Sequence, residues 1–255
     1  MIAQAGTGQI FNGWEGSDIS NKAVLNFTMK SNLVLTVNFI SNPFPNVQGN
    51  YSGLISDPHG VTPQSSGMIK LKVTPNGKFS GKLTIAGRTF SLAGQFDYTG
   101  HIKFPILRRP IQPVVLTMNL DLEGLKGIDG ELTDGYWTSV VNAERADATL
   151  SAKRSSQESF AFDLVNGTQS IGSGIAQADQ FVKISAQFPV GPPVVKNFLP
   201  TGNGFIPVYL PSRNGSEVLM GWLKFTNSPT APLAGDLILG TTNLPASVIG
   251  LVLSK

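Results

Sequence analysis

The stretch from residue 67 to 104 consists of short runs of alternating apolar and polar residues, and turn residues separate the runs at regular intervals. In the first run, Ile69, Leu71 and Val73 alternate with two lysines and a threonine. Successive side chains of a strand point to opposite faces of a sheet, so this run predicts a strand with one buried and one solvated face. Asn-Gly at 76–77 marks the turn to the next run. The pattern predicts an antiparallel β-meander.

Eight runs of this kind follow one another through the first half of the chain. They cover about 50–56, 67–74, 78–86, 88–97, 101–107, 113–122, 128–134 and 136–146. An up-and-down barrel or a strongly curled antiparallel sheet accommodates eight such strands. With only 14% charged residues, 28 Gly and 17 Pro, the composition suits turn-rich β structure, and helices should be nearly absent. The predicted fold class is all-β.

The second half of the chain shows a similar order of apolar runs, which indicates an internal duplication of roughly one hundred residues. We therefore expect two barrel-like or curled-sheet domains, at 49–146 and 158–255, preceded by a short β unit at 1–42. The proline-containing segment 41–48 is predicted as a linker, and the polar segment 147–158 as the crossing between the two domains.

The β unit at 1–42 should contain a strand near 25–29 and another near 33–39. Its sequence GWEGSD, followed by LNFTMKSNLVLTVNF, resembles the closing half of internalin-type B-repeats over residues 10 to 40. Those repeats occur in large surface and secreted bacterial proteins. The strands that should precede GWEG are missing, so we expect the chain to be part of a longer polypeptide.

Three later segments extend this resemblance. YSGLISDPHGVTPQSSGMIKLKVTPNGKFSGKLTIAGRTFSLAGQFDYTG, TDGYWTSVVNAERA and FIPVYLPSRNGSEVLMGWLKFTNSP are similar to a module that follows internalin-type repeats in large exported proteins. This resemblance implies architecture and an extracellular or cell-surface location rather than a chemical activity.

Charge and cysteine content exclude several classes of function. The net charge of +3 is small and spread along the chain, so we expect no nucleic-acid partner. The chain has no cysteine, which rules out disulfides, thiolate metal sites and thiol catalysis. The sequence contains no recognisable signal peptide and no apolar run of the ~20 residues that a membrane-spanning helix needs, so membrane insertion is not expected.

No catalytic, cofactor or metal site emerges from the motifs. The only histidines, His59 and His101, fall at turns, and no zinc-binding or serine-hydrolase motif surrounds them. Asp121 and Glu123 share one face of a predicted strand, but it is the polar face. We therefore expect no enzymatic activity, no cofactor and no bound metal.

Four lysines line the polar face of one predicted hairpin, at positions 70, 72, 78 and 82. They could attract anionic polymers. Because exposed lysines also keep edge strands from pairing with other chains, edge protection is the favoured interpretation.

Aromatic residues supply the strongest sequence argument for ligand binding. Tyr136 and Trp137 follow a Thr-Asp-Gly turn, where exposed rings could stack against sugars. Alternation puts only one of them inside, and we expect Trp137 to be buried and Tyr136 exposed. Trp222 is predicted to lie in the core of the second domain, at a position analogous to Trp137.

The sequence thus favours a non-enzymatic structural or adhesion module of a secreted or cell-surface bacterial protein, with a surface partner or polysaccharide as its ligand. The alternative is a carbohydrate-binding module that serves a catalytic domain elsewhere in the parent chain. A third hypothesis, a lipocalin-like barrel, requires an open cavity instead of a filled interior.

Overall fold

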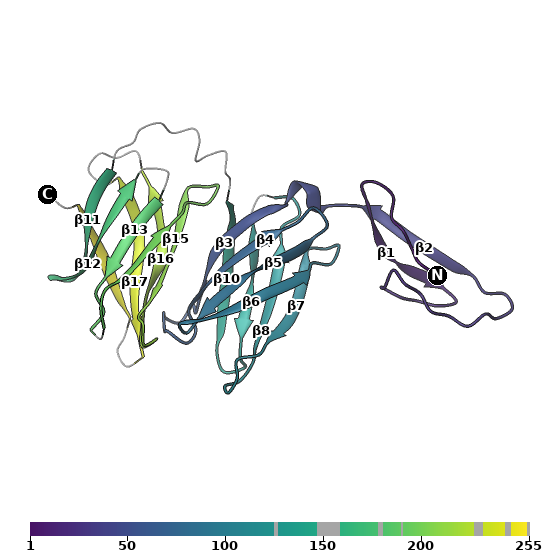
Figure 1. Cartoon of the computed structure of the whole chain (residues 1–255), viewed down its shortest axis with the longest axis horizontal. Coiled ribbons are helices and arrows are strands. Elements are labelled where there is room, and N and C mark those ends of the chain that lie inside the picture. Colours follow the sequence, from purple (N-terminus) through teal and green to yellow (C-terminus); the bar gives the residue numbers. More distant parts are fainter. Residues whose placement is uncertain are drawn as a thin grey trace.

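The structure, a computed structural model, describes residues 1–124, 127–146, 159–177, 181–189, 191–226, 232–242 and 246–253. Three β units follow one another along its longest axis (Figure 1). The helical structure of the described residues is a single 3₁₀ turn, η1 (Phe44–Asn46), so the all-β prediction is confirmed. No helix within those residues has the length and apolar character needed to cross a membrane.

The first unit is a two-stranded antiparallel sheet of β1 (Gln9–Gly16) and β2 (Leu35–Ser41). The ring of Trp14 is buried beside Phe11. The strand predicted near 25–29 is wrong, because that segment finds no partner strand: next to it, only an isolated bridge joins Ile2 to Val24. Alternation alone does not make a strand when the backbone groups have no ladder to join.

The second unit, the first barrel, is one eight-stranded antiparallel sheet. Its strands are β3 (Gly49–Ser56), β4 (Gly67–Val73), β5 (Lys78–Ile85), β6 (Arg88–Gln95), β7 (His101–Ile106), β8 (Val114–Leu120), β9 (Ile128–Thr133) and β10 (Thr138–Ala146). The order β6-β5-β4-β3-β10-β9-β8-β7 shows that the first and last strands pair, while β6 and β7 remain edges. The sheet is therefore a nearly closed barrel, as predicted.

Inward-facing apolar side chains fill this barrel. On β4 they are Ile69, Leu71 and Val73, the alternating set seen in the sequence. The prediction of β8 is two residues too long, because Gly124 donates its backbone N–H to the Asp121 carbonyl and the chain turns there. Asp121 and Glu123 consequently lie on a turn and not on a strand.

The segment predicted as a linker instead closes one end of the first barrel. Phe44 and Val47 are fully buried within its core cluster. Gly77 lies under Phe44: it has φ +72°, and a Cβ there would come within 2.6 Å of the Phe44 ring. Only a glycine allows both the turn and this close contact. Two prolines gave this segment the composition of a linker, but its aromatic residue makes it part of the core.

The third unit, the second barrel, has the same strand order. Its strands are β11 (Ser159–Asn166), β12 (Gln169–Gln177), β13 (Phe181–Ala186), β14 (Val194–Phe198), β15 (Phe205–Pro211), β16 (Glu217–Phe225), β17 (Leu233–Thr241) and β18 (Ser247–Leu253). β11 pairs with β18, and β14 and β15 are the edges, so every strand has a topological equivalent in the first barrel. A common sequence origin of the two barrels stays a prediction. The predicted crossing at 147–158 lies outside the described residues.

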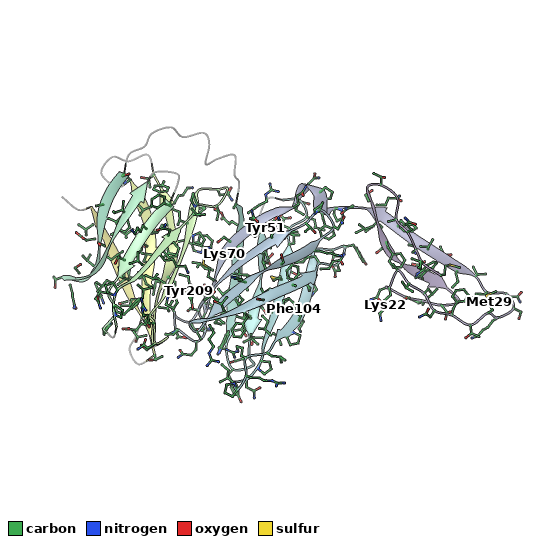
Figure 2. The ribbon with its side chains drawn as sticks, viewed as in Figure 1. Lys22, Met29, Tyr51, Lys70, Phe104 and Tyr209 are labelled. Carbon is green, nitrogen blue, oxygen red and sulfur yellow. The ribbon has the colours of Figure 1, made fainter. Side chains whose placement is uncertain are left out.

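The two barrels share a buried apolar cluster, here called the interbarrel cluster. Leu54, Val61 and Met68 come from the first barrel, and Tyr209 from β15 is fully buried against them. The remaining members belong to β16 and β17 of the second barrel: Val218, Met220, Trp222 and Ile238. Figure 2 shows Tyr209 where the two barrels meet. Apolar contact of this kind fixes one barrel against the other.

Candidate functional site

A cavity of about 420 Å³ opens beside the interbarrel cluster, between the outer face of the first barrel and the end of β14. We call it the interbarrel cleft. The first barrel contributes residues of β3, β4 and β5, most of which point away from its core, and Ala146 at the end of β10, and the second contributes the segment 198–200. Volumes of roughly 300–1,000 Å³ are typical of ligand-binding sites. The cleft exists only because the two barrels are in contact.

Three lysines line the floor of the cleft: Lys70 and Lys72 on β4, and Lys82 on β5. Lys70 lies directly opposite Lys82 in the sheet register, so two ammonium groups are cross-strand neighbours. In the part of the chain that the structure describes, no carboxylate lies within 4.0 Å of these lysines. Like charges directly opposite each other destabilise a sheet.

Edge protection does not explain these lysines. β4 and β5 lie inside the sheet, with β6 outside them, so neither strand offers a free edge for another chain to pair with. The sequence interpretation was wrong because the position of a strand in a sheet depends on pairings that local alternation does not encode. The repulsion between Lys70 and Lys82, on two strands inside the sheet, therefore needs another explanation.

A fourth lysine approaches from the second barrel. Lys196 on β14 donates a hydrogen bond from Nζ to the backbone carbonyl of Tyr209 on β15, at 3.2 Å. This bond spans the two unpaired edges of the second barrel. Burial lowers the pKa of Lys196, and the positive charge of Lys70 lowers it further. The positive charges of Lys70 and Lys196, one from each barrel, therefore interact across the interface.

Hydrogen bonds fix the wall of the cleft that the second barrel supplies. The N–H of Gly202 donates to the carbonyl of Arg145 at 2.7 Å, and the Thr201 hydroxyl donates to a Glu144 carboxylate oxygen at 2.6 Å. Both acceptors lie on β10 of the first barrel. The loop after β14 is thereby tied to the first barrel at the mouth of the cleft, beside the exposed side chain of Leu199.

The structure separates the two aromatic residues predicted as a binding site. Tyr136 is 88% exposed at the turn before β10, whereas Trp137 is half-buried and packs against the core of the first barrel. The guanidinium of Arg108 lies 5.8 Å from the centre of the Trp137 ring and forms an ion pair with Asp134 at 3.1 Å. The turn therefore presents one exposed ring and not a pair of rings in one plane.

Trp222 lies in a different environment from the one predicted. It is on β16, which corresponds to β8, whereas Trp137 precedes β10, so the two tryptophans are not equivalent. Leu219 and Leu223 of β16 face the core, and Trp222 faces outward into the interbarrel cluster, edge to face with Phe205. The sequence predicted that Trp222 would be buried, but it did not indicate that residues between the two barrels would bury it.

Both histidines lie at exposed positions, as the sequence indicated. Nδ1 of His59 is 3.1 Å from Asp57, and Nδ1 of His101 is 2.8 Å from the side-chain oxygen of Asn119. Among the described residues, no three His, Asp or Glu side chains gather in a way that could hold a metal ion. Neither histidine lines the interbarrel cleft.

Sequence reasoning found the lysines but missed the cleft. The alternation of β4 shows that Lys70 and Lys72 point away from the core. Nothing local, however, indicates that residues 198–200 lie across from them. A signal that could have helped is the outward tyrosine of FIPVYLP, an apolar residue where solvent would be expected.

Comparison with known proteins assigns the chain neither a family nor a function. No protein-family model matches the chain, and no curated protein matches it. Among solved structures, the chain is similar to a candidate outer membrane protein from Bacteroides fragilis, at 11% sequence identity and a TM-score of 0.27. That likeness covers 84% of this chain and 100% of the other. A TM-score this low carries no argument about function.

Proposed function

We propose that the chain is a non-enzymatic interaction module of an exported or cell-surface bacterial protein, and that its partner binds in the interbarrel cleft. The resemblance of residues 10 to 40 to internalin-type repeats supports the surface location. The row of β units in Figure 1 suits a module within a longer surface polypeptide.

The observation that carries this proposal is that both barrels build the cleft and that a buried interface holds it in shape. Lys70 and Leu199 come from different barrels, yet both line one cavity. Tyr209, fully buried between the barrels, keeps the two walls at a fixed separation. A preformed cavity binds its ligand without first having to order its walls.

The test is a binding array of purified polysaccharides and surface proteins, probed with the full chain. Ser80 lines the cleft on β5, so Ser80→Trp should fill it and abolish the array signal. Val140→Trp is the matched control, because Val140 is a partly exposed strand position of the same barrel outside the cleft. Because the module is proposed to be non-enzymatic, bound polysaccharides should keep their chain length after incubation with it. The absence of any binding, or binding that survives Ser80→Trp, contradicts the proposal.

A second candidate function, a carbohydrate-binding module, draws on the exposed ring of Tyr136. Its turn is braced: the Tyr136 N–H donates to Asp134 Oδ1 at 3.1 Å, and the Thr133 hydroxyl donates to the Trp137 carbonyl at 2.6 Å. An aromatic ring held in place offers a flat apolar surface to a sugar. Loss of polysaccharide binding in Tyr136→Ala, with binding intact in Ser80→Trp, would favour this function over the first.

A further inference from the structure

We propose that the interbarrel cleft binds a segment of an acidic polysaccharide, with carboxylate or sulfate groups on the lysines and sugar rings against the floor. This inference rests on the proposed function and names the ligand class for the same cleft.

Uncompensated positive charge is the first argument. Lys70, Lys72 and Lys82 line one cavity, and Lys196 stands close enough to Lys70 for the two charges to interact. No described carboxylate lies within 4.0 Å of any of the four. A cleft lined by charge of one sign concentrates the field and attracts ligands of the opposite sign. An anionic ligand would also relieve the repulsion between these ammonium groups.

The spacing of the lysines favours a polymer over a single small anion. Lys70 and Lys72 are two residues apart on β4, which separates their Cα atoms by about 7 Å along the strand. Lys82 stands across from Lys70, about 5 Å away between Cα atoms. The positive charges therefore extend along the strand and do not converge on one point. A chain with an acid group on successive units can meet several of them at once.

The remaining lining of the cleft suits sugar rings. Met68 and the aliphatic stems of the lysines provide apolar surface beneath the ammonium groups, and Leu199 provides it from the second barrel. Asn50, Ser52 and Ser80 add an amide and two hydroxyls between the strands. Sugars present C–H groups on ring faces and hydroxyls on ring edges, so both kinds of surface find a partner here.

Two other anionic polymers fit less well. Single-stranded nucleic acids bind by stacking bases on exposed aromatic rings. The aromatic residues of the cleft, Tyr51 and Phe198, are both buried. An acidic peptide that adds a strand to the floor of the cleft needs a free sheet edge there, and β3, β4 and β5 are each paired on both sides. Nucleic acid and acidic peptide are outcomes that the test distinguishes.

The experiment compares two forms of one polymer by isothermal titration calorimetry. Polygalacturonate carries a carboxylate on every unit, and its methyl ester carries none. We expect binding of the acid form only, weakened as sodium chloride rises from about 0.05 to about 0.5 M. Lys70→Gln combined with Lys82→Gln should weaken binding about ten-fold. The control is Lys78→Gln, since Lys78 is exposed on the same face of β5 but outside the cleft, and this variant should bind as the wild type does.

Each failure has a distinct meaning. Equal binding of the ester, or no effect of the double lysine variant, overturns the acidic ligand but leaves the proposed function standing if Ser80→Trp still abolishes binding to another array ligand. If oligonucleotides or poly-glutamate bind more tightly than any acidic polysaccharide, the ligand is a nucleic acid or an acidic peptide, and the acidic polysaccharide is overturned. Binding that no cleft variant changes overturns both proposals.

Discussion

The edge strands β7 and β15 occupy the same position in the two barrels, yet their outward faces differ completely. The inward residues of both are apolar, such as Phe104 on β7 and Val208 on β15. Outward, β7 presents exposed Lys103 and Pro105, whereas the outward Tyr209 of β15 is fully buried. The inward pattern makes each barrel, and the outward pattern decides whether the barrel has a neighbour.

The strands β4 and β12 also occupy the same position in the two barrels, and their outward faces differ in charge. β4 carries Lys70 and Lys72 on its outer face, and the equivalent positions of β12 include Ser173 and Ile175. Of these two equivalent strands, therefore, only β4 of the first barrel carries positive charge on its outward face. The two sheets have the same topology, and the residues on their outward faces make their surfaces different.

The largest effect should come from removing the side chain that joins the barrels. Tyr209→Ala empties a fully buried site, and we expect a loss of about 3–5 kcal/mol of unfolding free energy. Small-angle scattering should show a longer molecule as the barrels separate. The matched control, Lys103→Ala at an exposed outward position of β7, should change stability by less than about 0.5 kcal/mol. A stable, compact Tyr209→Ala protein would contradict the role of the interbarrel cluster.

Phe44→Ala should destabilise the first barrel by about 3–5 kcal/mol, since the ring is buried in that barrel alone. Hydrogen exchange followed by mass spectrometry reads the two barrels separately, and exchange should quicken in peptides from β3 to β10. Pro45→Ala, at an exposed neighbour, is the control. The wild-type chain should also resist proteolysis around residue 44. Ready cleavage there would restore the linker interpretation.

The interbarrel contact should weaken at high pH. Burial raises the pKa of Tyr209 to about 12, although the backbone of Gly87 acts in the opposite direction. Because the folded pKa lies above the usual value of 10.0, the stabilisation is complete below pH 10 and disappears as the pH rises to about 12. The expected loss is about 2–3 kcal/mol.

Tyr209→Phe isolates this titration. Among the residues that the structure describes, none forms a hydrogen bond with the Tyr209 hydroxyl. The variant should therefore keep its stability near neutral pH. Denaturant unfolding of both proteins from pH 9 to 12 measures the difference. Parallel curves for wild type and variant would show that the pKa of Tyr209 is the same in the folded and unfolded states, so that burial does not raise it.

The smallest effect concerns the charge that distinguishes the two barrels. Lys70→Gln removes the repulsion with Lys82 and should raise stability by about 0.2–1 kcal/mol in thermal unfolding. The same variant should bind the acidic polymer more weakly. Opposite signs for stability and binding are expected where a protein keeps an unfavourable arrangement for its ligand. A variant that loses stability would instead give Lys70 a structural role.

Much of the fold could be predicted from the sequence because alternation and turn residues act locally. Each strand of the first barrel lies within two residues of its predicted ends, and Asn76 and Gly77 lie in the turn between β4 and β5, as predicted. The prediction failed where the structure of a segment depends on residues that are distant in the sequence. The run at 25–29 alternates but has no neighbour to pair with, and Phe44 lies in a proline-containing segment yet fills the end of a barrel.

The sequence by itself therefore determined which residues face inward, since a period of two and a turn need only neighbours along the chain. It also showed that Lys70 and Tyr136 point outward. Only the tertiary structure decided the environments of outward residues: Tyr136 stays exposed, Tyr209 is buried between two barrels, and Lys70 lines a cleft. The physical reason is that these environments depend on contacts between segments more than one hundred residues apart. Packing of that kind leaves no periodic pattern in the sequence.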